Sequence, residues 1–442
     1  MDLLPDIGLC EVSPIQNIEF RQSANLILAI DKLYDDMRPN VFVKDDKNFI
    51  PDRKLEFNEI GKLINEKSKP DEELKLSLEL QIKKADDKKK TTMKRIEVIL
   101  DDINKTAAAG GSPKLLIRNQ SLWTNCVFEF NRIALKSSHE AKKTKITYST
   151  TDNRSRFNSV VFVLTKIHDL LTKNLTVTRR ELFYQNVLRF RNQSNLDLAV
   201  RDVCCLLECP PWELGLIATA KGLIAGSLHI ETAVGKIIDC MVTGGTVIPQ
   251  DVIGLKSFKS EAKYILVVEK DAIFQKLLDE GALLRLGPVI IMTGKGYPDI
   301  CTRQLLVRLT SELRLQALAL VDADPHGYEI YLTYKYGSLA QSHLSASLAC
   351  PSLALLGARF SDIITLAPEG ARLKLTELDK RKINSILRRP YLNTSGGKQL
   401  CEELNGMLKS GVKAEIEALA PTAAALCDAY LPAKIIQGDF IK

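Results

Sequence analysis

Acidic side chains follow two apolar runs of the sequence, in a pattern that could hold a divalent cation. Glu269 follows the run YILVV, and Asp322 and Asp324 follow the run QALALV. Asp322 and Asp324 are two residues apart, so in an extended segment their side chains point the same way. Three carboxylates at one sheet edge repel one another unless a cation lies between them, and oxygen ligands favour Mg²⁺ or Mn²⁺. The alternative is that an acid here caps a helix, as Asp324 before Pro325 could.

The strands that must position these acids alternate with helical stretches. Four short apolar runs begin near Tyr264, Pro288, Gln316 and Leu353, and helical patterns separate them. Continuous apolar strands that alternate with helices predict an α/β fold with a parallel, doubly wound sheet. In such a sheet functional groups gather beyond the carboxyl ends of the strands, which is where the three acids lie.

A segment upstream of the acids, at 121–250, has the pattern of a DNA-binding domain. Apolar residues of Ser159–Lys173 lie on one helix face, Asn174 then breaks the helix, and Thr178–Phe190 predicts a second helix. A helix, a short break and a second basic helix resemble a helix-turn-helix, whose second helix enters a DNA groove. Arg179, at the start of that second helix, is therefore a candidate DNA contact.

The distribution of charge supports a polyanionic ligand. The chain has a net charge of +7, but 131–191 holds thirteen Lys and Arg against four acids, a local net of +9. The remainder of the chain therefore sums to −2. One segment contains the whole basic excess, as binding to DNA requires, although a charge excess also serves solubility.

Length and composition indicate an intracellular protein of two domains with an extension. A chain of 442 residues exceeds what one core usually spans. Residues 1–120 are rich in Glu, Lys, Asp and Leu and predict a helical, partly mobile extension. No run approaches the ~20 apolar residues that a membrane helix needs, and the N-terminus lacks a signal-peptide pattern. The ten cysteines contain no CxxC pair, so we expect reduced thiols.

The acidic segments resemble a known family. ILVVEKDAIF with VDADPHGYEIYLTYKYGS resembles a Toprim domain, which has a Glu after one strand and a DxD after another. DPHG and GKGYPDICTR more narrowly resemble the A subunit of topoisomerase VI and its eukaryotic relative, the meiotic double-strand-break protein. The resemblance covers about 155–419. It implies a winged-helix (CAP-like) domain at 121–250, a Toprim domain at 251–442, and Mg²⁺ (or Mn²⁺) held by Glu269, Asp322 and Asp324.

The same resemblance implies a tyrosine nucleophile. TRRELFYQN resembles the family pattern T-x-R-[DE]-[IL]-[FY]-Y, in which the nucleophile maps onto Tyr184 and the family arginine onto Arg180. Residues four apart are neighbours on one helix face. A phenol with a pKa of about 10 is a weak nucleophile, and a guanidinium beside it favours phenolate character or holds the scissile phosphate. An aromatic on an amphipathic helix more often packs, so the assignment depends on the acids and the flanking motif.

Two further positions are candidate DNA contacts. LGLIATAKGLIAG resembles the loop and strand that close the family's winged-helix domain, and Lys221 within it is a candidate phosphate contact. Tyr297, in GKGYPD, either touches the minor groove or packs within its loop. His326, in DPHG, either satisfies a backbone group or joins the chemistry.

The resemblance implies a nuclear enzyme that breaks duplex DNA to initiate meiotic recombination. Its active site would be composite in a homodimer, with 5′-phosphotyrosyl products, accessory recombination proteins and a topoisomerase VI B-like partner subunit. The lysine-rich N-terminal segment and the cysteines at 203–209 favour the meiotic protein. The alternatives are the A subunit of a true type IIB topoisomerase, a non-catalytic DNA-binding scaffold, and a Toprim primase or nuclease, which would not need Tyr184.

Overall fold

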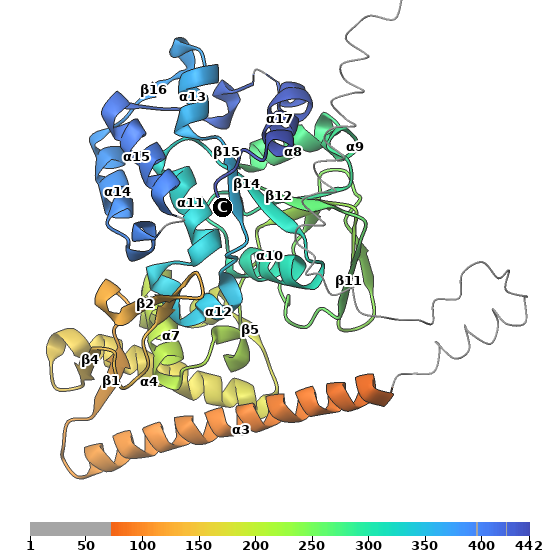
Figure 1. Ribbon diagram of the computed structural model, residues 1–442. Helices are drawn as coiled ribbons and strands as arrows, with labels where there is room; N and C mark the ends of the chain where they lie inside the picture. The colour runs from red at the N-terminus through yellow and green to blue at the C-terminus, as the bar shows by residue number, and fades with distance from the viewer. Residues whose placement is uncertain (1–71, 395–396, 421) are drawn as a thin grey trace, which may run out of the picture. The chain divides into compact units, whose positions relative to one another are not determined.

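A computed structural model describes residues 72–394, 397–420 and 422–442 of the protein (Figure 1). The chain forms two compact units. The helical unit comprises 72–118 and 143–217, and the sheet unit comprises 119–142 and 218–442. No helix within the described ranges is long and apolar enough to span a membrane.

The units divide the chain at different residues from the predicted domains. Part of the predicted extension, 72–118, belongs to the helical unit, because helix α3 (Glu72–Ala108) buries Ile96 and its Arg95 donates to the carbonyl of Leu207 at 3.0 Å. Residues 218–250 belong to the sheet unit, because strand β7 (Leu223–Gly226) joins the large sheet. The LGLIATAKGLIAG segment therefore spans both units: Leu216–Ile217 pairs with β5 (Val177–Thr178) of the helical unit, and Leu223–Gly226 joins the large sheet. The remainder of the predicted extension, 1–71, lies outside the described residues.

The helical unit packs long helices against a small sheet. Residues Val160, Val163, Leu164 and Ile167 of α4 are fully buried, and α4 packs on α7 and α3. The other elements of the unit, by their bounds, are β1 (Lys114–Arg118), β4 (Lys143–Thr147), α4 (Thr151–Lys173), β5 (Val177–Thr178), α5 (Arg179–Tyr184), α6 (Val187–Phe190), α7 (Gln193–Leu207) and β6 (Leu216–Ile217). The predicted helix at 159–173 is confirmed as part of α4.

The second predicted helix of this unit is not continuous. It forms two short helices, α5 and α6, and Asn186 between them has a non-helical backbone. The Asn186 side-chain amide donates to the carbonyl of Leu182 at 2.9 Å. A side chain that takes a helical carbonyl in this way competes with the backbone and ends the helix. The prediction of one helix over 178–190 was therefore wrong.

The sheet unit is built on a six-stranded sheet with helices on both faces. The strand order is β10–β7–β13–β12–β14–β15, in which β13, β12, β14 and β15 run parallel and β7 is antiparallel to β13. The bounds are β10 (Thr246–Val247), β12 (Tyr264–Val268), β13 (Val289–Thr293), β14 (Gln316–Leu320) and β15 (Ala354–Gly357). All four predicted strands are confirmed to within about a residue of their predicted starts.

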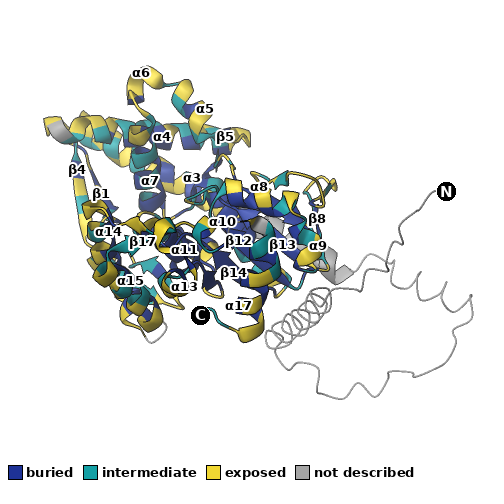
Figure 2. Cartoon of the chain, turned by 90° about the horizontal axis from the view of Figure 1, so that it is seen from above, coloured by how far each residue is buried: buried dark blue, intermediate teal, exposed yellow. Residues whose placement is uncertain are grey.

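Alternate residues of the central strands pack against different helix layers. Ile265 and Val267 belong to one buried cluster, whereas Leu266 and Val268 belong to the other. Figure 2 shows these strands in the buried colour, and most of α6 of the helical unit in the exposed colour. The α-helices of the sheet unit are α8 (Asp271–Asp279), α9 (Ala282–Arg285), α10 (Ile300–Glu312), α11 (Pro325–Tyr336), α12 (Ser345–Leu348), α13 (Phe360–Leu366), α14 (Glu377–Leu387), α15 (Lys398–Ser410), α16 (Ala423–Ala425) and α17 (Leu431–Gln437).

The winding direction of the sheet reverses between the neighbouring strands β12 and β14. The chain crosses from β12 to β13 on one side and then returns past β12 to β14 on the other side. The helix after β12, α8, packs in one buried cluster, and the helix after β14, α11, packs in the other. A crevice forms between the carboxyl ends of two such strands, so this topology positions the candidate site.

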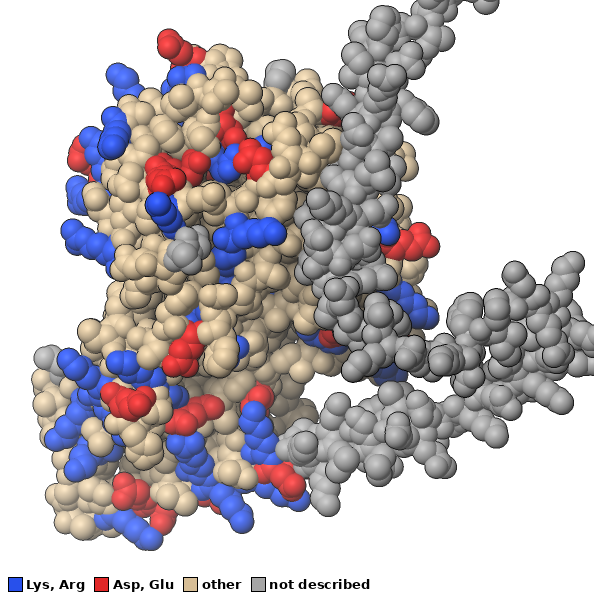
Figure 3. Space-filling model, viewed as in Figure 1, with Lys and Arg blue, Asp and Glu red and all other residues tan. Residues whose placement is uncertain are grey.

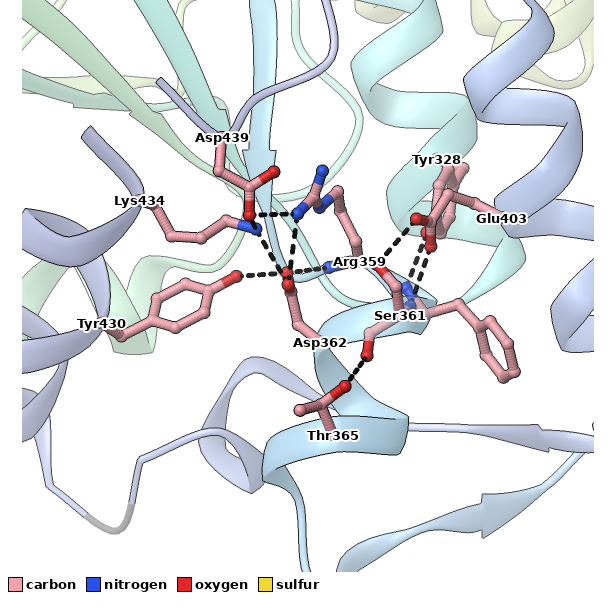
Figure 4. Close-up of polar contacts among 10 residues, drawn as sticks. Tyr328, Arg359, Ser361, Asp362, Thr365, Glu403, Tyr430, Lys434 and Asp439 are labelled. Carbon is pink, nitrogen blue, oxygen red and sulfur yellow. Dashed lines mark hydrogen bonds and ion pairs between the residues drawn. The ribbon is translucent and has the colours of Figure 1, made fainter. Parts of the chain in front are cut away.

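A buried ionic cluster anchors the C-terminal helix α17 to α13 (Figure 4). Asp362 accepts hydrogen bonds from Tyr430 at 2.6 Å and from Lys434 at 2.8 Å. Asp439 accepts from the same Lys434 at 2.8 Å and from Arg359 at 2.5 Å. Burial alone would raise the pKa of Asp362, but the hydrogen bonds from Lys434 and Tyr430 hold it below its ordinary value. The two acids and two bases therefore compensate one another.

Candidate active site

Two of the predicted acids meet at the reversal point of the sheet. Glu269 follows β12 and Asp322 follows β14, and the parallel register pairs Val268 with Leu320. The backbone N–H of Asp322 donates to Glu269 Oε2 at 2.9 Å. The structure therefore brings together two of the three acids that the sequence pattern predicted to converge.

Gly327 allows helix α11 to begin close to this pair. A Cβ at Gly327 would lie 2.3 Å from the Asp322 carbonyl oxygen and 2.9 Å from Glu269 Oε2. Real Cβ atoms do not approach backbone at such distances, so any larger residue must displace the acid pair. The glycine of the DPHG motif is therefore required by the packing of the site.

We expect Gly327→Ala to destabilise the protein by about 1–3 kcal/mol, because the added methyl overpacks the space beside Asp322 and Glu269. Denaturant unfolding followed by circular dichroism measures the change. Gly370→Ala is the matched control, because a Cβ there meets no atom within 4 Å. Equal stability of the two variants would contradict the packing argument.

Asp322 is held on both of its oxygens. Oδ1 accepts from the backbone N–H of Ile416 at 2.9 Å, and Oδ2 forms an ion pair with Lys270 at 3.1 Å. Lys270 also lies 3.1 Å from Glu415 and 3.1 Å from Glu417, on the segment that follows α15. Sequence reasoning missed Lys270, Glu415 and Glu417. The only sequence signal for Lys270 was its position next to Glu269. No local pattern connects Lys270 to Glu415 and Glu417, which lie much later in the chain.

Asp324 serves as a helix cap. It is the N-cap of α11, and its Oδ1 accepts from the N–H groups of His326 at 2.9 Å and Gly327 at 2.7 Å. The contacts of Asp324 are therefore those of the helix cap that the sequence offered as the alternative to a metal ligand. Within the described ranges, no three His, Cys, Asp or Glu side chains are grouped as a metal site.

Burial shifts the protonation of both paired acids. It raises the pKa of Glu269 to about 8, and the negative charge of Asp322 adds to the rise. Burial also raises the pKa of Asp322 to about 6, against the opposing effects of the Ile416 N–H and Lys270. The Glu269 carboxylate, which resists ionisation beside Asp322, is stabilised in its charged form by a nearby cation.

The donor chemistry of Glu269 and Asp322 fits a hard divalent cation. Both supply carboxylate oxygens from adjacent strand ends, and Mg²⁺ commonly takes one or two protein carboxylates, with water and substrate phosphates as its remaining ligands. Asp324, two residues further on, has the same donor type. The ammonium group of Lys270 already places one positive charge beside Asp322.

Tyr184 and Arg180 lie in the helical unit, on α5. Thr178 Oγ1 caps this helix by accepting from the N–H of Glu181 at 3.1 Å, and buried Leu182 holds its inner face. Arg180 is exposed, and Tyr184 is 73% exposed at the last residue of the helix. The Tyr184 ring lies beside that of Phe183, with centroids 5.6 Å apart, but most of the side chain is exposed, which leaves the phenol accessible to a ligand.

The three predicted DNA contacts have partners within the chain. Arg179 forms an ion pair with Asp197 at 3.4 Å in the helical unit. Lys221, in the sheet unit, donates from its backbone N–H to Asp299 at 2.8 Å and from its ammonium to the carbonyl of Lys295 at 3.1 Å. Lys221 therefore holds the GKGYPD loop.

Tyr297, in that loop, joins α11. Its hydroxyl donates to Glu329 and lies 3.3 Å from Nδ1 of His326, and its side chain is 43% exposed. Burial and the contact with Glu329 raise the pKa of Tyr297. The packing interpretation of Tyr297 accounts for its hydroxyl, while part of the ring stays accessible.

Known proteins resemble this chain over both units. Residues 264–435 match the Toprim-domain family of the topoisomerase 6 A-subunit/Spo11 proteins, and residues 155–216 match the type IIB DNA topoisomerase family. The meiotic recombination protein SPO11 of Mus musculus is 36% identical over 349 residues, which cover 78% of this chain and 87% of that protein. The A subunit of DNA topoisomerase 6 from Arabidopsis thaliana is 36% identical over 351 residues, covering 78% and 80%. The mixed α/β chain with its Toprim domain therefore belongs to the topoisomerase 6 A-subunit/Spo11 family.

Proposed function

We propose that this protein cleaves duplex DNA by tyrosine transesterification and makes the double-strand breaks that initiate meiotic recombination in the nucleus. The observation that carries the proposal is the exposed phenol of Tyr184 on a capped helix, in a chain whose sheet unit pairs Glu269 with Asp322. Membership of the topoisomerase 6 A-subunit/Spo11 family supports it, because meiotic recombination proteins are among the relatives.

In the proposed reaction, Tyr184 Oη attacks a phosphorus atom of the DNA backbone. A P–O bond to the phenolic oxygen forms as the bond to the 3′ oxygen breaks. The phenolic proton passes to solvent, and the 3′ oxygen gains a proton from water. The strand then carries a 5′-phosphotyrosyl link, and the number of ester bonds is conserved. No nucleotide hydrolysis is needed for cleavage itself.

The remaining residues bind and polarise the phosphate. Arg180, one helical turn before Tyr184 on an exposed face, is placed to hold the scissile phosphate or favour the phenolate. Glu269 and Asp322, with Asp324, would hold Mg²⁺ or Mn²⁺, which supplies electrostatic stabilisation of charge on the phosphate and the departing oxygen when bound. Lys270 keeps Asp322 in position through its ion pair.

The proposed assembly is a homodimer that works with accessory recombination proteins and a topoisomerase VI B-like subunit. Tyr184 belongs to the helical unit and the acids belong to the sheet unit. The proposed reaction therefore uses the tyrosine of one unit with the acids of the other. The family resemblance implies that the two sets come from different copies. One copy alone should then fail to cleave, whereas the dimer breaks both strands.

Label transfer from DNA to protein tests the proposal. The first prediction is that transfer depends on the divalent cation. The complex purified from cells is incubated with 3′-end-labelled duplex and Mg²⁺, denatured, and separated on a gel. We expect label on the protein band, which decreases to background when a chelator is present and returns when Mn²⁺ is added, because the cation stabilises the transition state.

The product distinguishes the proposal from its rivals. Free 5′ ends with no attached protein would indicate a Toprim nuclease and would contradict the role of Tyr184. DNA binding without any cleavage by the purified complex would indicate a scaffold. In either case, the transesterase proposal would be rejected.

The A subunit of a true type IIB topoisomerase is the second candidate, because the Arabidopsis thaliana topoisomerase 6 relative is as similar to this chain as the SPO11 relative. ATP-dependent relaxation of supercoiled DNA by the complex would favour this function. Breaks that are not religated would favour the recombination protein.

A further inference from the structure

A run of cations lies on and after helix α14, on the opposite side of α11 from the sheet. The segment 380–389 carries five Lys and Arg and no acid. Figure 3 shows Lys and Arg side chains projecting at the edge of the sheet unit where α14 lies. Lys and Arg clustered along a helix are typical of a surface that binds a polyanion.

Three of these five cations are neutralised by acids of the same unit. Lys380 pairs with Glu377 at 2.7 Å. Lys382 and Arg389 both form ion pairs with the half-buried carboxylate of Glu329 on α11. Glu329 also accepts the Tyr297 hydroxyl, so a single carboxylate fixes the basic segment to α11 and to the GKGYPD loop.

The other two, Arg381 and Arg388, are exposed and line a groove of about 520 Å³. Among the described residues, neither forms an ion pair; the charge of Arg381 acts on Glu377, which is already paired with Lys380. They are seven residues apart, which places both on one face of the helix, about 10 Å apart along its axis. Asn384 and Ser385, between them on the same face, are exposed hydrogen-bonding side chains that also line the groove.

Trp123 forms the wall opposite the helix. Its indole lines the groove and packs edge-on against Tyr391, with ring centroids 6.3 Å apart. The ring is therefore held in place while part of it stays accessible. An aromatic face beside two guanidinium groups offers packing for a sugar and charge for the adjoining phosphates.

We propose that the groove between α14 and Trp123 binds the sugar–phosphate backbone of duplex DNA, outside the cleavage site. Arg381 and Arg388 contact phosphates, Asn384 and Ser385 donate to phosphate oxygens, and Trp123 packs on a deoxyribose. The inference rests on the proposed function and adds to it a second place at which the protein contacts DNA. DNA is favoured over an acidic peptide because the groove belongs to the same compact unit as the acid pair, and Glu329 on α11 fixes the basic segment within that unit.

The salt dependence of DNA binding tests the proposal. Arg381→Gln/Arg388→Gln is compared with the wild-type full chain by fluorescence anisotropy on a labelled duplex, at salt concentrations from about 50 to about 200 mM. Each lost phosphate contact decreases the slope of log affinity against log salt by about 0.9 and the affinity at about 0.1 M salt by on the order of tenfold. We therefore expect the slope of the double variant to be about 2 units shallower.

Three comparison variants separate a contact from a general charge effect. Lys398→Gln/Lys409→Gln removes the same charge from exposed positions on α15 and is expected to leave the slope within error of wild type. Arg381→Lys/Arg388→Lys should restore most of the slope, because it keeps the charge. Trp123→Ala should weaken binding without changing the slope, since the indole carries no charge.

The outcome is independent of whether Tyr184 is the nucleophile. The double arginine variant should still form the covalent adduct at saturating DNA, whereas loss of the nucleophile would abolish the adduct and leave the slope unchanged. An unchanged slope and affinity for Arg381→Gln/Arg388→Gln would overturn the proposal. Loss of an acidic protein partner from the purified complex, with DNA binding intact, would instead assign the groove to that partner.

Discussion

Tyr184→Phe is expected to leave no covalent protein–DNA adduct, while DNA binding and stability stay close to those of the wild-type protein. The substitution removes the one oxygen that forms the phosphotyrosyl bond in the proposed reaction. The side chain is 73% exposed, so loss of its hydroxyl disturbs no packing. Label transfer on a denaturing gel measures the adduct, and anisotropy on the same duplex measures binding.

Tyr148→Phe is the matched control for this experiment. Tyr148 belongs to the same unit and is 43% exposed, but it packs against Phe157 and lies outside the motif around Tyr184. Its variant should form the adduct at the wild-type level. An adduct that persists with Tyr184→Phe would exclude Tyr184 as the nucleophile, and peptide mass spectrometry of the labelled band would then identify the residue that replaces it.

Glu269→Gln is expected to stabilise the metal-free protein at alkaline pH and to decrease cleavage by on the order of 100-fold. Burial raises the pKa of Glu269 from 4.5 to about 8, so the folded protein holds a proton that the unfolded chain releases. The stability associated with this proton is fully present below pH 4.5 and is lost as the pH rises through about 8. A glutamine keeps the acceptor for the Asp322 N–H and has no charge to bury.

Denaturant unfolding in the presence of a chelator measures the stability effect. Above pH 8 we expect Glu269→Gln to exceed wild type by about 2 kcal/mol, a value that allows for partial solvent screening of the carboxyl, and at pH 4.5 we expect the two proteins to converge. Glu261→Gln, at an exposed position before β12, is the control and should change little. A Glu269→Gln variant that is less stable than wild type throughout this range would show that the carboxylate is stabilised rather than strained.

The stability and cleavage effects of this variant have opposite signs for one physical reason. A carboxylate that is costly to ionise in the folded protein is one that a cation binds favourably. Removing the charge relieves the repulsion from Asp322 and at the same time removes a ligand. A loss of cleavage without any gain in stability would indicate that Lys270 already neutralises the pair.

The central sheet and the two acids that meet in it could be predicted from local sequence. Each strand is a continuous apolar run, and such runs indicate a buried parallel strand without information from elsewhere in the chain. Glu269 and Asp322 follow strands whose carboxyl ends lie at one edge, so their convergence follows from the alternation of strands and helices. The motif around Tyr184 could also be recognised from local sequence, because all of its residues lie within about two helical turns.

The surroundings of these residues depend on contacts that form only in the folded chain. Lys270 meets Glu415 and Glu417, and Trp123 meets α14, because the fold brings together segments that are more than a hundred residues apart. The break between α5 and α6 depends on one side-chain hydrogen bond from Asn186. The placement of β7 in the large sheet depends on its pairing with β13. Local periodicity carries no information on such partners, since each is selected by burial and hydrogen bonding across the assembled core.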